Sequence, residues 1–105
     1  MIKIKTLDNG LRLVVNEMPQ MASCDLGIFI KAGGRNETKD LSGISHFIEH
    51  MLFKGTPTRT CQEIKEEIEG CGGLLNAFTS HESTCYYSKI MGNEYKKAIK
   101  VLSDM

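Results

Sequence analysis

The dipeptide Asn9-Gly10 places the strongest local constraint on the fold of this chain. It lies between residues 2–7 and 11–16, two short runs in which apolar and polar side chains alternate. Asn-Gly between alternating runs is a strong signal of a β-hairpin, because both residues tolerate the positive φ angles of its tight turn. The chain is therefore expected to begin with two antiparallel strands.

Three more strands are predicted from period-two patterns. In residues 24–31 the side chains of Leu26, Ile28 and Ile30 share one face and Phe29 lies on the other, which predicts a central strand buried on both faces. Residues 74–80 and 83–90 are also strand-like, with His81-Glu82 at the turn between them.

Three helices are predicted. Ser42 is the expected N-cap of a helix over residues 43–54, or about 42–55 with its caps, and Gly55 follows its end. Its apolar stripe is formed by Ile44, Phe47, Ile48, Met51 and Leu52. A capping box at residues 60–63 starts a second helix, whose core-facing stripe is Cys61, Ile64, Ile68 and Cys71. A third helix over residues 93–105, capped by Gly92-Asn93, presents Tyr95, Ala98, Ile99, Leu102 and Met105 on one face.

The resulting order is β-β-β-α-α-β-β-α, without the regular alternation of βαβ units. This order predicts an α+β fold in which helices pack against a mostly antiparallel sheet. At 105 residues the chain is long enough for one domain, so residues 1–105 are assigned to a single unit.

Composition excludes several kinds of partner. The 13 basic and 13 acidic residues balance to a net charge of zero and are scattered along the chain, so we expect no nucleic-acid partner. No apolar run has the length of a membrane span, and the first residues lack the apolar core of a signal peptide, so we expect a cytoplasmic protein without a membrane partner. The four cysteines form no Cys-x-x-Cys pair, which favours reduced and mostly buried thiols.

Two histidines and a carboxylate lie within five residues of the first predicted helix. On a helix, His46, Glu49 and His50 share one face, because they stand at positions i, i+3 and i+4. The histidines could bind one metal ion, and Glu49 could take a proton from a water molecule that the ion activates. Burial of three polar groups on an otherwise apolar helix favours a metal site, but the pattern alone is also compatible with hydrogen-bonded core or surface histidines.

The spacing His-x-x-Glu-His is the inverted form of the zincin motif. Residues 46–56 (HFIEHMLFKGT) resemble the active-site helix of the pitrilysin or insulinase (M16) family of zinc metallopeptidases, which includes the mitochondrial processing peptidase and its bacterial homologues. Residues 32–37 resemble the family's turn into that helix, and residues 72–80 resemble its edge strand. The resemblance extends from Leu11 to about Met105.

The resemblance implies a role for each matching residue. His46 and His50 match the ligands of one zinc ion, and Glu49 matches the general base. The backbone of the edge strand (about residues 74–80) matches the strand to which an extended peptide substrate is added, through Asn76, Ala77, Phe78 and Thr79. The side chain of Asn76 would also hold the peptide. Phe53 would help to form a pocket near the scissile bond, although simple core packing is the alternative for it.

The family's third zinc ligand is a glutamate farther downstream than this sequence reaches. The resemblance therefore implies the N-terminal fragment of one zinc-peptidase domain, which needs a complementary domain or subunit, or forms a homo-oligomer. His81 or Glu82 could replace the missing ligand by position alone. Two alternatives to an endopeptidase module remain: a non-catalytic metal-binding subunit on the same fold, and a structural domain stabilised by metal.

Overall fold

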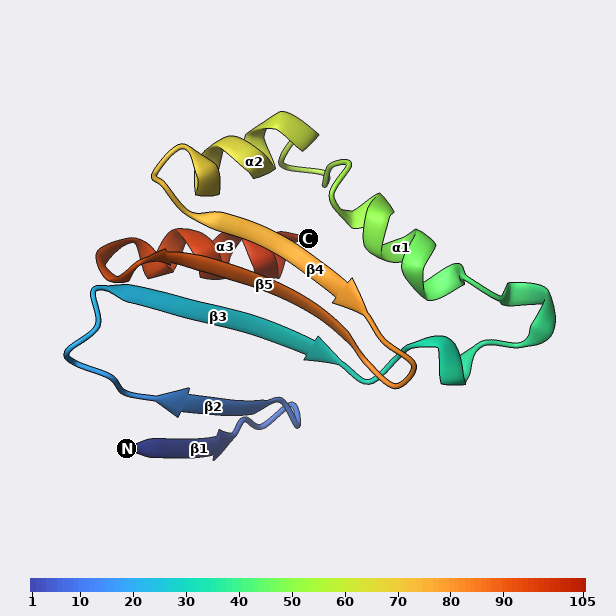
Figure 1. Ribbon diagram of the computed structural model, residues 1–105, viewed down its shortest axis with the longest axis horizontal. Coiled ribbons are helices and arrows are strands. Elements are labelled where there is room, and N and C mark those ends of the chain that lie inside the picture. Colours follow the sequence, from blue (N-terminus) through green and yellow to red (C-terminus); the bar gives the residue numbers. More distant parts are fainter.

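The computed structural model describes residues 1–105, and its largest sheet has three antiparallel strands. These are β3 (Ser23–Ile30), β5 (Thr84–Met91) and β4 (Leu74–Thr79), in the order β3-β5-β4, so β4 and β3 form the two edges. The remaining strands, β1 (Ile2–Thr6) and β2 (Arg12–Asn16), form a separate antiparallel hairpin (Figure 1). The predicted hairpin is confirmed, and Gly10 has the positive φ angle of 89° that its turn requires.

The three helices are α1 (Ile44–Leu52), α2 (Cys61–Glu69) and α3 (Tyr95–Asp104). Short 3₁₀ turns at Gly34–Asn36 and Lys39–Leu41 precede α1, and another at Gly92–Glu94 precedes α3. This order of elements and the purely antiparallel pairing confirm the predicted α+β fold. No helix has both the length and the apolar character that crossing a membrane requires.

The core lies between the sheet and two of the helices. Its five members are each exposed by 2% or less, and they are Ile64 and Ile68 of α2, Ile90 of β5, and Ala98 and Val101 of α3. The predicted stripe of α2 is thus confirmed at its two isoleucines. The predicted face of α3 is partly wrong, because Val101 is buried in place of Tyr95 and Ile99, which are exposed by 41% and 42%.

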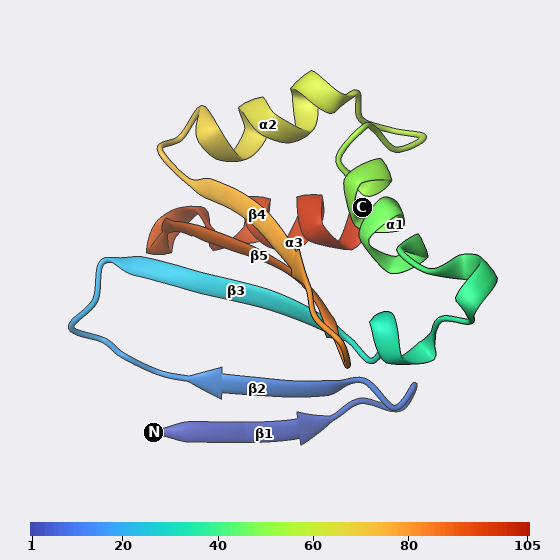
Figure 2. The same ribbon diagram turned by 45° about the vertical axis from the view of Figure 1, so that its right-hand side comes forward.

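The prediction that residues 24–31 form a central strand is wrong. β5 is the central strand of the sheet, and β3 pairs only with it. Phe29 is 71% exposed, so the face of β3 on which it lies is largely open to solvent. In both views β2 runs beside β3, yet the two strands belong to different sheets (Figures 1 and 2).

The apolar stripe of α1 does not face the core. Phe47, Ile48 and Met51 are exposed by 59%, 48% and 50%, whereas Glu49 is 9% exposed and faces the sheet. The helix lies beside the C-terminal part of β4 in both views (Figures 1 and 2). The side of α1 that carries Glu49 therefore meets the sheet, whereas both histidines and most of the apolar stripe stay exposed.

The cap predicted at Gly92-Asn93 is also wrong. These residues form the 3₁₀ turn, and Glu94 is the N-cap residue of α3, without a side-chain capping bond. All four cysteines are free as predicted, but only Cys85 is buried and the other three are half-buried.

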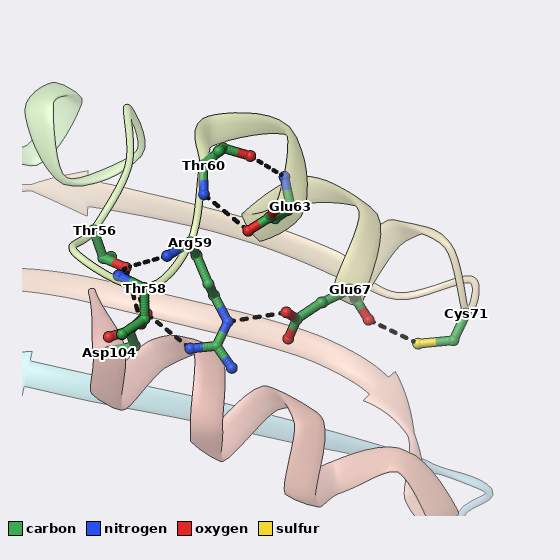
Figure 3. Close-up of polar contacts among 8 residues, drawn as sticks. All are labelled: Thr56, Thr58, Arg59, Thr60, Glu63, Glu67, Cys71 and Asp104. Carbon is green, nitrogen blue, oxygen red and sulfur yellow. Dashed lines mark hydrogen bonds and ion pairs between the residues drawn. The ribbon is translucent and has the colours of Figure 1, made fainter.

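A polar clasp joins the loop after α1 to the end of α3 (Figure 3). Oδ2 of Asp104 accepts hydrogen bonds from the hydroxyls of Thr56 and Thr58, at 2.6 and 2.9 Å. The same oxygen pairs with Nη1 of Arg59 at 2.7 Å, and Nε of Arg59 donates to Glu67 of α2 at 3.0 Å. These bonds lower the pKa of Asp104 and raise that of Arg59. The clasp therefore holds the loop after α1 against the C-terminal end of α3.

Candidate metal centre

His46 and His50 stand one turn apart on the exposed surface of α1. Their Nε2 atoms lie 3.0 Å apart, and the two rings meet edge to face at 81° with centroids 4.5 Å apart. The helical repeat explains this proximity, because residues at i and i+4 lie above one another on one face. Both rings direct Nε2 towards the same small region of space.

This arrangement fits a zinc ion. Two nitrogens at about 2.0–2.1 Å from a tetrahedral zinc lie about 3.3 Å apart, close to the observed separation. A ligand atom of Glu49 lies within 4.8 Å of both histidine nitrogens, and no other group of three metal-binding side chains meets that distance. His81 and Glu82 are outside the group: Nδ1 of His81 faces Gly34, and Glu82 pairs with Arg35 at 3.0 Å.

The carboxylate of Glu49 lies between the histidines and the sheet. Its Oε2 accepts a hydrogen bond from the hydroxyl of Thr79, the last residue of β4, at 2.5 Å. The buried Tyr86 lies nearby: burial raises the pKa of its hydroxyl first, and the negative charge of Glu49 raises it further. The half-buried ring of Phe53 packs against Tyr86 with centroids 6.2 Å apart. Glu49 is therefore a carboxylate held at the border between an apolar wall and the two imidazoles.

The N-terminus of α1 is capped by a residue outside the helix. Gly43 is its N-cap residue, with φ 89°, and provides no side-chain bond, so the predicted cap at Ser42 is wrong. Instead, the two carboxylate oxygens of Glu37 accept the backbone N–H groups of Gly43 and Ser45, at 2.9 and 2.8 Å. These bonds, led by the one from Ser45, lower the pKa of Glu37. A negative charge at this end also interacts favourably with the helix dipole.

The predicted substrate strand is an edge strand, as β4 pairs with β5 on one side only. Its side chains alternate, so Leu75, Ala77 and Thr79 are half-buried and Asn76 and Phe78 are exposed. The N–H of Ala77 donates to the side-chain oxygen of Asn76 at 2.8 Å, and Phe78 lies 6.2 Å from the ring of Tyr87. The free edge runs towards the end of the strand where Thr79 contacts Glu49.

Two contributions to this centre were missed by sequence reasoning. The alternation of β4 could have assigned the Thr79 side chain to the same face as Ala77, but not its contact with a helix 30 residues away. No pattern in the sequence marks Glu37 as a cap, because it lies 6 residues before Gly43.

Comparison with known proteins gives consistent matches. The family described as "Insulinase (Peptidase family M16)" matches residues 12–105. The "Uncharacterized zinc protease YmxG" of Bacillus subtilis is 48% identical over the whole chain, which covers 26% of that relative. The "Probable mitochondrial-processing peptidase subunit beta" of Arabidopsis thaliana is 43% identical over 98% of this chain and 19% of its own length.

A solved structure is similar across nearly the whole fold. A protease from Helicobacter pylori superposes with a TM-score of 0.92 at 30% identity, over 99% of this chain and 25% of that one. The chain therefore spans about a quarter of the length of these relatives, or less.

Proposed function

The chain belongs to the M16 (insulinase) family of peptidases, and we propose that its residues supply part of the catalytic centre of a zinc metalloendopeptidase. One observation carries the proposal: the Nε2 atoms of His46 and His50 converge at 3.0 Å beside the carboxylate of Glu49. Relatives that carry "zinc protease" in their names support zinc as the metal.

His46 and His50 would hold one zinc ion through Nε2. Bound zinc supplies Lewis acidity, which polarises the carbonyl of a scissile peptide bond and makes a water molecule easier to deprotonate. Catalytic zinc sites use three protein ligands and one open position. The side chains around these two histidines supply the base but no third ligand, so we propose that the third ligand comes from outside these 105 residues.

Glu49 is the proposed general base. Its carboxylate takes a proton from the attacking water and can return it to the leaving amine, since acid and base roles alternate during peptide hydrolysis. Glu49 lies on the same helical turn as the histidines and is buried beside Tyr86. This position keeps its carboxylate close to the proposed zinc site without requiring it to be a ligand.

The open edge of β4 is the proposed binding site for an extended peptide. An added strand pairs with an exposed sheet edge through backbone hydrogen bonds, while its side chains alternate between the two faces. Asn76, Ala77, Phe78 and Thr79 form the part of this edge nearest to Glu49. Asn76 would exchange its bond with Ala77 for one with the peptide. Phe53, packed on Tyr86, would border the pocket for a side chain next to the scissile bond.

We further propose that residues 1–105 form the N-terminal part of one zinc-peptidase domain, completed by a complementary domain or subunit or by a second copy. The large apolar residues left exposed on α1 and on the open face of the sheet support this proposal, because single domains rarely expose so many.

The substitution Glu49→Gln tests the proposed function. In the protein assembled with the part that supplies the third zinc ligand, peptide hydrolysis in the presence of zinc should fall by about 10²- to 10⁴-fold, because the amide cannot accept the proton. Zinc binding, measured by competition with a chelator, should remain, whereas His46→Ala should weaken it strongly. Undiminished hydrolysis by the Glu49→Gln variant would exclude Glu49 as the base.

A further inference from the structure

The contact between Thr79 and Glu49 links the proposed substrate strand to the proposed base. It joins residues that are 30 positions apart, one ending β4 and one in the middle of α1. The side chain of Glu49 has no other hydrogen-bond partner and no ion pair, although only 9% of the residue's surface is exposed. The orientation of this carboxylate therefore depends on one hydroxyl group.

A glutamate side chain rotates about three torsions, so the direction of its carboxylate is fixed only by its contacts. The Thr79 hydroxyl donates to Oε2, which leaves Oε1 without a partner. Thr79 touches neither histidine through a hydrogen bond, whereas a ligand atom of Glu49 lies within 4.8 Å of both. The hydroxyl can thus direct one carboxylate oxygen without taking part in metal binding.

We propose that Thr79 is a positioning residue: its hydroxyl holds Oε2 of Glu49 so that Oε1 faces the water molecule that attacks the substrate. This inference rests on the proposed function of Glu49 as the base. It gives Thr79 a side-chain role in addition to the backbone role of β4. The strand β4, which is proposed to align the peptide, would thus also orient the carboxylate of the general base.

The alternative is that the bond merely fastens α1 to β4. Thr84 provides a matched control for that purely structural role, because it lies opposite Thr79 in the sheet register and its hydroxyl donates to the carbonyl of Ala32 at 2.7 Å. Replacement of either threonine by valine keeps the side-chain shape and removes one buried hydroxyl bond. Only Thr79→Val removes a bond to Glu49.

The first measurement is steady-state peptide hydrolysis with zinc, by the protein assembled with the part that supplies the third zinc ligand. In Thr79→Val, kcat should fall by about 10- to 100-fold with KM nearly unchanged, because misdirection of a catalytic group by about 1 Å has effects of that size. Thr79→Ser, which keeps the hydroxyl, should recover most of the loss. Thr84→Val should not lower kcat. An unchanged kcat in Thr79→Val, or an equal loss in Thr84→Val, would overturn the proposal.

The second measurement needs no activity and no metal. In protein labelled with ¹³C at glutamate Cδ, the signal that Glu49→Gln removes belongs to Glu49. That signal should shift in Thr79→Val, return towards its original position in Thr79→Ser and stay in place in Thr84→Val. If the chemical shift of Glu49 is unchanged in Thr79→Val, no such bond orients Glu49. If the signal responds as expected but the protein, assembled with the part that supplies the third zinc ligand, shows no zinc-dependent hydrolysis, the proposed function fails and the contact itself stands.

Discussion

Glu37 stabilises the candidate centre from outside the helix that carries it. Its carboxylate binds the first free N–H groups of α1, and His46 follows directly after the capped Ser45. A helix end whose N–H groups lack partners frays. The position of the first histidine therefore depends on an acidic residue in the preceding loop.

The stabilising effect of Glu37 should depend on pH with a definite sign. Because its hydrogen bonds lower its pKa in the folded protein, its contribution is complete above the ordinary glutamate value of 4.5 and is lost as pH falls through the folded-state value. Thermal unfolding of Glu37→Gln should show a lower Tm than the unsubstituted protein at pH 7, and the gap should close at lower pH.

The control for this prediction is Glu82→Gln. Glu82 forms only an exposed pair with Arg35, with both side chains about 70% exposed, and such pairs add little stability. If its effect on Tm equals that of Glu37→Gln at pH 7, the capping role is wrong.

At the scale of single residues, the sequence was sufficient to predict that His46, Glu49 and His50 lie close together, because a helical repeat alone brings them together. It was insufficient to predict the contacts of Thr79 and Glu37. Their contacts depend on how α1 is packed against β4 and on the path of the loop that precedes it.

At the scale of elements, α1 and α2 have similar apolar periodicity, but the apolar side of α2 faces the core and that of α1 is largely exposed. The isoleucines of α2 are fully buried, whereas Ile48 of α1 is 48% exposed. A periodic pattern identifies an amphipathic helix, but which of its faces meets the rest of the protein depends on what else is present.

Two isoleucine substitutions measure this difference. Ile68→Ala should lower the free energy of unfolding by about 2–5 kcal/mol, the range for deletion of a buried aliphatic side chain. Ile48→Ala should change it by only about 0.5 kcal/mol, as for a surface position. Urea denaturation of both variants provides the measurement, and similar losses would mean that the apolar face of α1 is covered in this chain.

The same limit explains the wrong prediction for β3. Its alternating residues correctly predict a strand, and Leu26 does pack against the core. Phe29 suggested burial on the second face, but the exposed position of that ring shows that nothing in these residues covers it. The local sequence pattern predicts whether a segment is a strand or a helix. How many of its faces are covered depends on which other elements pack against it.

At the scale of the whole molecule, the clasp around Asp104 is a long-range polar connection. It spans 48 residues between Thr56 and Asp104 and ties the loop after α1 to both α2 and α3 through Arg59 and Glu67. The side chains of Arg59 and Asp104 are only 19% and 20% exposed, so their pair is less screened than a surface pair.

Asp104→Asn should therefore lower Tm more than Glu94→Gln, a substitution in the 3₁₀ turn before α3 that breaks only the more exposed pair with Lys97. The amide removes the negative charge that Arg59 faces and weakens the three hydrogen bonds that one carboxylate oxygen of Asp104 accepts. Differential scanning calorimetry of the two variants gives the comparison. Equal shifts would mean that the clasp is no stronger than an ordinary surface pair.

The exposed apolar face of α1 has a consequence for local unfolding. Regions with few buried apolar contacts open at a lower free energy than the core does. On its sheet side, α1 is held by the contact of Glu49 with Thr79, while the loops at its two ends are tied by Glu37 and the clasp. We therefore expect α1 to detach at a lower free energy than the unfolding of α2, α3 and β5 requires. A ligand that binds only the attached helix would then shift the population towards it, and order in the centre would rise with ligand concentration.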